Sequence, residues 1–363
     1  MLTCSGQWWY MRRKELRALA AVTCPLVVYD EETLNETFFD LLALDAIETL
    51  LYPIHLNPHP KILRKVLEMG GVFQCVSPRE LQQLLALFPG ITPKALLSAP
   101  DRATEQDLSL AFRNDIPVLI RDPRMIGENP RVFHNRKIFI ELPADSDGKA
   151  IMRSMRSTLS RFSITLAGIS LQPQDDFSLS STRDSWLPGL PEEYDLFAKR
   201  PVLIMGDETG IIAATQEGSI DFRSTEERTR TVHETLPRFS LWLQPGFEIL
   251  AKAGVLLTAA GKTGEKQGQY GAAMQTPVYL PGEDSGRKTL HHLVNLTRVQ
   301  EEIPTVTISS GQEPQGHVPL QEGEILLVTN MGAFRWDELF NDHENRALSE
   351  HYMPARSMCP VKL

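Results

Sequence analysis

The sequence predicts an α/β fold in which a (β/α)8 TIM barrel precedes a C-terminal β domain. From residue 34 to about residue 250, short apolar runs alternate with amphipathic segments, and eight such runs occur. Apolar strands that alternate with helices indicate a parallel sheet covered on both faces, and eight units indicate a closed barrel. After residue 250 the apolar runs are separated by turns rich in glycine and charge, which predicts β structure.

The expected elements follow in chain order. A short helix runs into residues 18–22, and Pro25 separates it from a strand that begins at Leu26. Helical spacing of three and four residues joins Ile62, Leu63, Val66 and Leu67, and again Leu81, Leu84, Leu85 and Phe88. The predicted barrel strands are 47–56, 72–77, 95–100, 116–121, 137–142, 164–171, 201–206 and 239–244, and later strands are expected at 253–260, 305–310, 324–330 and 357–363. The polar stretch 175–193 is predicted to be a long loop that interrupts the barrel.

Composition excludes several classes of protein. A hydrophobic content of 42% over 363 residues supplies a large core, so a mainly disordered chain is excluded. The net charge of −9 and the absence of basic runs interleaved with aromatics argue against a nucleic-acid partner. No apolar run reaches the length of a membrane span, and the four cysteines show no CxxC spacing, so we expect a cytoplasmic protein without a zinc site or a disulfide framework.

Several segments together resemble the pyridoxal-phosphate (PLP) dependent diaminopimelate decarboxylase family, which has an alanine-racemase-like barrel of PLP fold-type III. The segments are WWYMRRKELRALA with PLVVYDEETL, NPHPKILRKVLEMGGVFQCVSPREL, LQPGFEILAKAGVLL, HHLVNLTR, EGEILLVTNMGAF and HYMPAR, all in the same order as in the family. The likeness is greatest to the decarboxylase half of bifunctional aspartate kinase/diaminopimelate decarboxylase. It implies that residues 1–33 contribute a helix and a strand to the β domain, with the barrel at 34–250 and the β domain at 251–363.

The cofactor lysine of the family is missing from this sequence. The family pattern at the end of the first barrel strand is Tyr-Ala-x-Lys-Ala-Asn, and here Tyr52 to Asn57 read YPIHLN. The resemblance therefore puts His55 where the family lysine forms a Schiff base with PLP. Imidazole forms no stable imine, so the covalent attachment is predicted to be lost.

Other cofactor positions of the family have changed as well. Its phosphate-binding glycine triplet corresponds to Gly206, Asp207 and Glu208, where two carboxylates would repel a phosphate. Its Glu-Pro-Gly-Arg corresponds to Gln244 through Phe247, which removes the charged partner of the ring nitrogen and the arginine at the phosphate. The catalytic cysteine motif corresponds to Gln312 and Glu313, and the cofactor tyrosine to Phe334. We therefore predict a protein that binds no PLP and has no catalytic residues of the family type.

Three functions remain open from the sequence. The first is an inactive decarboxylase homologue, a pseudoenzyme that works as a binding, scaffolding or regulatory protein, as a homodimer or as a heterodimer with an active relative. The second is a repurposed enzyme or ligand-binding protein that uses His55, Asp207 and Glu208 at the barrel mouth, although no third histidine at ligand spacing indicates a metal. The third is a PLP-dependent decarboxylase, for which Lys61 or Lys65 would have to replace the missing lysine.

Residues outside the barrel mouth also have two interpretations. Trp8 and Trp9 could anchor a partner, but burial against the β domain is the expected outcome. His291 and His292 are expected to pack or to form hydrogen bonds rather than to bind a metal.

Overall fold

The computed structural model describes residues 2–3, 6–100, 104–143, 146–172, 190, 194–206, 222–260, 291–298, 302–303, 306–308, 321–333 and 349–356. The described residues form two compact units. The barrel unit lies within Asp40–Ala213 and Asp221–Gly246, and the sheet unit lies within Met1–Phe39 and Phe247–Leu363. Of the predicted loop at 175–193, only residue 190 is described. The predicted strand at 357–363 lies outside the described residues.

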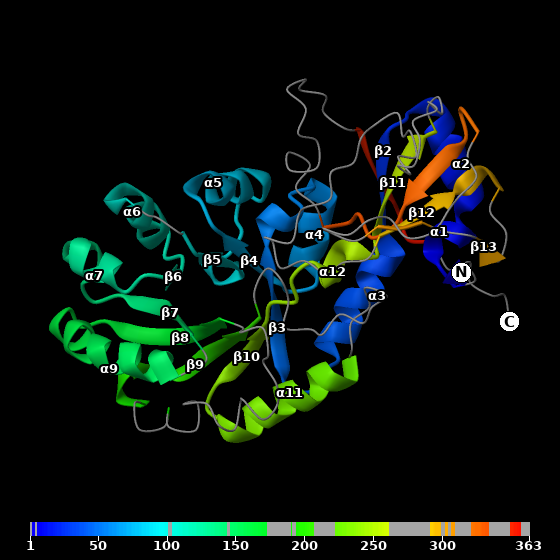
Figure 1. Ribbon diagram of the computed structural model, residues 1–363. Helices are drawn as coiled ribbons and strands as arrows, with labels where there is room; N and C mark the ends of the chain where they lie inside the picture. Colours follow the sequence, from blue (N-terminus) through cyan, green and yellow to red (C-terminus); the bar gives the residue numbers. More distant parts are fainter. Residues whose placement is uncertain are drawn as a thin grey trace, which may run out of the picture. The chain divides into compact units, whose positions relative to one another are not determined.

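The barrel unit is a closed barrel of eight parallel strands, which confirms the predicted fold class (Figure 1). Each predicted apolar run supplies one strand. The strands are β3 (Ile47–Pro53), β4 (Val72–Cys75), β5 (Leu96–Ser98), β6 (Val118–Ile120), β7 (Lys137–Pro143), β8 (Thr165–Gln172), β9 (Phe197–Met205) and β10 (Ser240–Leu243). Strand β10 pairs with both β9 and β3, and this pairing closes the barrel.

Helices cover the outside of this barrel (Figure 1). They are α4 (Pro60–Glu68), α5 (Pro78–Leu87), α6 (Glu105–Arg113), α7 (Arg124–Glu128), α8 (Pro130–Phe133), α9 (Ser146–Arg161) and α11 (Phe222–Thr235). The start of α5 shows why the sequence folds in this way locally. Ser77 caps the helix by accepting a hydrogen bond from the Glu80 N–H at 3.3 Å, and Pro78 occupies the first turn, where no N–H is needed.

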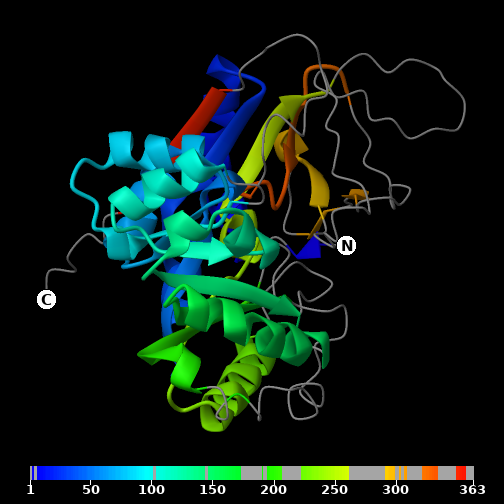
Figure 2. The same ribbon diagram turned by 90° about the vertical axis from the view of Figure 1, so that its left-hand side faces the viewer.

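The sheet unit contains a six-stranded sheet in the order β14-β12-β15-β11-β2-β16. Its strands are β2 (Leu26–Asp30), β11 (Gly254–Ala259), β12 (His291–Asn295), β14 (Val306–Ile308), β15 (Ile325–Val328) and β16 (Ser349–Met353). Strand β2 lies between β11 and β16, so the N-terminal strand is part of this sheet as predicted; Figure 2 shows it beside β16, drawn in red. A separate pair joins β1 (Leu2–Thr3) to β13 (Glu302–Ile303).

Short helices accompany the sheet. They are α1 (Trp8–Met11), α2 (Arg13–Val22), α3 (Glu31–Leu42) and α12 (Glu248–Ala251). Trp9 is buried in one core with Leu16, Val28 and Val255, which confirms the expected burial, and the Trp8 Nε1–H donates to the Lys252 carbonyl at 2.7 Å. No helix in the described part of the chain is long and apolar enough to cross a membrane.

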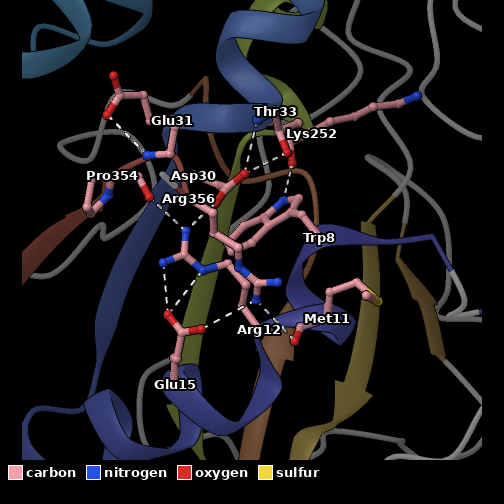
Figure 3. Close-up of polar contacts among 11 residues, drawn as sticks. Trp8, Met11, Arg12, Glu15, Asp30, Glu31, Thr33, Lys252, Pro354 and Arg356 are labelled. Carbon is pink, nitrogen blue, oxygen red and sulfur yellow. Dashed lines mark hydrogen bonds and ion pairs between the residues drawn. The ribbon is translucent and has the colours of Figure 1, made fainter. Parts of the chain in front are cut away.

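A buried arginine connects three segments of the sheet unit (Figure 3). Arg12, which is 7% exposed, donates to the Asp30 carboxylate at 2.8 Å, to Glu15 at 2.8 Å and to the Pro354 carbonyl at 3.2 Å. The second oxygen of Asp30 accepts hydrogen bonds from the N–H and the hydroxyl of Thr33. A single guanidinium therefore joins the start of α2, the end of β2 and the segment after β16.

We expect Arg12→Met to destabilise the protein by about 3–5 kcal/mol, because it leaves the buried Asp30 carboxylate without its cation. Chemical denaturation followed by tryptophan fluorescence measures the loss. The control is Arg124→Met, which removes an ion pair with Asp122 of similar length whose arginine side chain is 85% exposed. Water and salt screen such a pair, so this variant should unfold like the wild type. Equal stability of the two variants would contradict the structural role of Arg12.

Candidate functional site

The inward-facing side chains of the barrel form two layers. The lower layer, the barrel floor, is apolar and includes Leu51, Val72, Leu119, Phe139 and Ile204, with Trp242 packed against it. Because side chains alternate along a strand, the residues two positions further also point inward, nearer the carboxyl ends of the strands. Four of these inward-facing residues are polar: Gln74, Arg121, Glu141 and Gln244. Ser170 on β8 lies beside Glu141 in the register of β7 and β8. We call this set the barrel rim: Gln74, Arg121, Glu141, Ser170 and Gln244.

The rim contains an ion pair between neighbouring strands. The Arg121 Nε lies 3.6 Å from the Glu141 Oε2, and the two side chains are 25% and 15% exposed. The pairing follows from the register of β6 and β7, in which Leu119 lies beside Phe139 and Ile120 beside Ile140. The two charges are opposite, so the pair contributes no net charge to the rim.

Gln74 has a different environment. It is 2% exposed, and its Oε1 accepts no hydrogen bond within the described part of the chain. Its neighbours on β4 show that it faces inward: Val72 belongs to the barrel floor, whereas Phe73 packs outside against Tyr52 and Phe88. A buried amide oxygen without a donor is a costly feature, and such a group commonly marks a ligand or water position.

His55 lies directly after β3, in a short 3-10 turn over Ile54–Leu56. The buried neighbours Ile54 and Leu56 fix this turn, while His55 itself is partly buried. The turn ends at Asn57, whose carbonyl accepts a hydrogen bond from the Tyr52 hydroxyl at 2.8 Å. The structure therefore places His55 at the carboxyl end of a barrel strand.

The ends of β9 and β10 meet at Gly206 and Gln244. The Gln244 N–H donates to the Met205 carbonyl at 2.8 Å, and Gln244 is buried. Gly206 has a φ of +104°, and a Cβ placed on it would lie 2.1 Å from the Gln244 carbonyl oxygen. Only glycine allows this approach, so the residue is required by the fold whether or not it contacts a ligand.

The remaining predicted site residues lie elsewhere. Phe247 is buried and precedes α12 in the sheet unit. The predicted positions Asp207, Glu208, Gln312, Glu313 and Phe334 lie outside the described residues. In the described part of the chain, no group of three or more His, Cys, Asp and Glu side chains could hold a metal ion.

His291 belongs to the core of the sheet unit. It is buried on β12, and its Nδ1 lies 2.9 Å from the Thr329 carbonyl oxygen. Burial disfavours the charged imidazolium and lowers the pKa of His291 to about 4. The expected packing role is therefore confirmed for His291, and the His292 N–H donates to the Thr329 hydroxyl.

The sequence alone did not predict Gln74, Arg121 and Glu141 as site residues. Each stands near the end of a predicted apolar strand, in VFQCVS, IPVLIR and KIFIEL. A polar residue near the carboxyl end of an otherwise apolar barrel strand was the available signal, because this end of a TIM barrel carries the functional groups.

No family model and no curated protein matches the sequence, but several solved structures share its fold. Lysine/ornithine decarboxylase from Vibrio vulnificus, complexed with putrescine, is 16% identical with a TM-score of 0.72, covering 95% of this chain and 98% of its own. Arginine decarboxylase from Paramecium bursaria Chlorella virus, bound to agmatine, is 13% identical with a TM-score of 0.71, covering 94% and 100%. Lysine decarboxylase from Selenomonas ruminantium is 17% identical with a TM-score of 0.68, covering 94% and 95%. The chain has a fold-type III decarboxylase-like fold.

PLP does not fit the described rim as a covalently bound group. The cofactor is held by the amine of a lysine, but every described lysine of the barrel unit lies on a helix, in the turn before a strand, or in the first third of a strand. These lysines are Lys61 and Lys65 on α4, Lys94 before β5, Lys137 as the first residue of β7, Lys149 on α9 and Lys199 as the third residue of β9. Lys65 is also paired with Glu68 at 3.0 Å.

We expect Gly206→Ala to destabilise the barrel more than Gly90→Ala, by about 2 kcal/mol or more. Both glycines have a positive φ, +104° and +97°, so both variants carry backbone strain. Only at Gly206 would the new methyl group meet a backbone carbonyl, whereas a Cβ on Gly90 meets nothing within 4 Å. Thermal and urea unfolding of the two variants isolate the steric term. Equal losses would show that β9 and β10 do not need this close approach.

Proposed function

We propose that this chain is a pseudoenzyme of the diaminopimelate decarboxylase type, which works by binding rather than by PLP chemistry. The observation that carries the proposal is the structure of the strand end at residue 55. An imidazole follows β3 there, and no described lysine of the barrel unit stands at the end of a strand where it could replace the family's cofactor lysine. The resemblance in the order of sequence segments supports the choice of family. Its role would be scaffolding or regulatory, in the cytoplasm, as a homodimer or as a heterodimer with an active relative.

The polar rim supports a second element of the proposal. Arg121 and Glu141 pair with each other, so neither presents a full charge to a cofactor phosphate or to a ring nitrogen. Gln244 can form a hydrogen bond to a ring nitrogen, but it carries no charge that would stabilise the protonated form. The rim is therefore suited to hydrogen bonding with a small molecule and poorly suited to the electron sink of PLP chemistry.

We expect the purified protein to bind no PLP covalently. Titration with PLP should produce only the spectrum of the free cofactor, and borohydride treatment should fix no pyridoxyl group on the chain. A structural neighbour described in complex with PLP and cadaverine serves as the positive control. A saturable imine spectrum from the wild-type chain would overturn the proposal.

We expect His55→Lys alone to release no carbon dioxide from diaminopimelate above the wild-type background. The variant restores an amine at the strand end but leaves the Arg121–Glu141 pair and the uncharged Gln244 unchanged, and catalytic groups that act as a unit are not additive. His59→Lys, four residues further on at the start of α4, is the matched control for an added lysine. Carbon dioxide release by the His55 variant but not by the control would show that the other losses matter little.

A further inference from the structure

We infer that the barrel unit has a second binding site, at the amino end of its strands, for a small zwitterion that carries a carboxylate at one end and an ammonium group at the other. His55 and the barrel rim lie at the opposite, carboxyl end of the strands, so this site is independent of the proposed function. Three observations support it: a cavity, charges of opposite sign on its two sides, and irregular strand pairing at two of the charged residues.

The cavity lies beside the first residues of β10 and has a volume of about 230 Å³. Because a water molecule occupies about 30 Å³ of the liquid, there is room for roughly eight waters, or for an organic molecule with a similar number of non-hydrogen atoms. The titratable side chains of its lining all belong to the barrel unit: Asp45 just before β3, Glu48 within β3, Arg200 on β9, His233 on α11 and Arg238 in the loop before β10.

Charges of opposite sign lie on the two sides of this cavity. Strand β10 runs between β3 and β9 (Figure 1), so the carboxylates of Asp45 and Glu48 belong to one side and the guanidinium of Arg200 to the other. Within the described residues, none of these three side chains forms a hydrogen bond or an ion pair. The strands β3 and β9 are about 10 Å apart, because adjacent strands are spaced by about 5 Å. A ligand that meets both sides must therefore carry its two charges at separate ends.

Glu48 and Arg200 both lie where strand pairing is irregular. Glu48 is an extra residue of β3, because its two neighbours on that strand pair with consecutive residues of β10. On β9, residues 198–201 stand opposite the single residue Ala167 of β8. Such bulges redirect side chains and are over-represented at barrel rims and next to active sites. Two bulges that each supply a charged residue to the same cavity indicate a site built by the fold.

Arg238 holds the β9 side of the cavity in place. Its guanidinium donates to the carbonyls of Lys199 at 3.1 Å and Ala198 at 3.2 Å, which belong to the bulge, and lies 4.6 Å from the centroid of the Tyr194 ring. The segment that carries Arg200 is therefore fixed before a ligand arrives, and this reduces the entropy lost on binding.

The charge of Arg238 adds to that of Arg200, so the β9 side is positive and the β3 side is negative. A dianion or a dication would place one of its ends beside side chains of the same sign, which opposes binding. A zwitterion complements both sides: its carboxylate accepts hydrogen bonds on the β9 side, and its ammonium group donates to the carboxylates on the β3 side.

The test titrates four small molecules into the whole chain by calorimetry. They are 4-aminobutyrate, the zwitterion with separated ends; succinate and putrescine, a dianion and a dication of similar length; and 2-aminobutyrate, the isomer with both charges on one carbon. The wild type should bind 4-aminobutyrate saturably and at least tenfold more tightly than each of the other three, because each of these loses at least one charge-assisted hydrogen bond.

Two variants should move this preference in opposite directions. Arg200→Gln removes the repulsion of a second ammonium group, so the preference should move at least tenfold from 4-aminobutyrate towards putrescine. Glu48→Gln should move it at least tenfold towards succinate for the same reason. Both side chains are exposed, so both variants should melt like the wild type. Arg113→Gln and Glu105→Gln remove the same charges from exposed positions on α6, outside the cavity lining, and should bind like the wild type.

A general loss of folded protein would weaken all four molecules alike, whereas opposite shifts in the two variants require a charge on each side of one site. The inference is overturned if the wild type does not bind 4-aminobutyrate at least tenfold more tightly than the other three molecules. It is also overturned if the preferences of the two variants stay unchanged or move in the same direction.

Discussion

Closure of the parallel sheet is the constraint on which the barrel unit depends. Once β10 pairs with β3, every second residue of each strand must point into a narrow interior. Apolar residues such as Leu119 and Phe139 fill the floor by packing against each other. The next inward residues of the same strands are Arg121 and Glu141, and in this position a charged group needs a partner from another strand. The ion pair is therefore a consequence of closure and register together.

The same closure separates the scaffold from the chemistry. Gly206 lets β9 and β10 approach each other, and the Tyr52 hydroxyl fixes the turn that carries His55. These contacts are needed for the strand ends to form, whatever binds there. The fold of the decarboxylases can therefore persist while the groups that hold a cofactor change, because a fold positions a site without determining its chemistry.

The sequence predicted the barrel well because each strand is a continuous apolar run bounded by turns. It also placed the strand from Leu26 in the β domain, through the resemblance to a family. It predicted no strand at β16, although HYMPAR belongs to the family resemblance, since SEHYM has a polar first half whose residues are exposed and only Tyr352 and Met353 are buried. The rim was missed for a different reason. Whether Gln74 or Phe73 faces inward depends on the register of β4 against its neighbours, and this register is fixed by contacts distant in the sequence.

The sheet unit shows a second case that the sequence could not reveal. Arg12, Asp30 and Pro354 are far apart in the chain, and only the parallel pairing of β16 with β2 brings the last of them to the guanidinium. In the sequence, Arg12 and Asp30 look like ordinary charged surface residues. Their burial is a property of the assembled sheet.

The most direct test of the account is a crystal structure of the protein purified from its native cells without added cofactor. The account predicts that Arg121 remains paired with Glu141, that the Gln74 Oε1 accepts a hydrogen bond from a non-covalent molecule or an ordered water, and that His55 is unmodified. Electron density for PLP that is continuous with the Nζ of any lysine would contradict it.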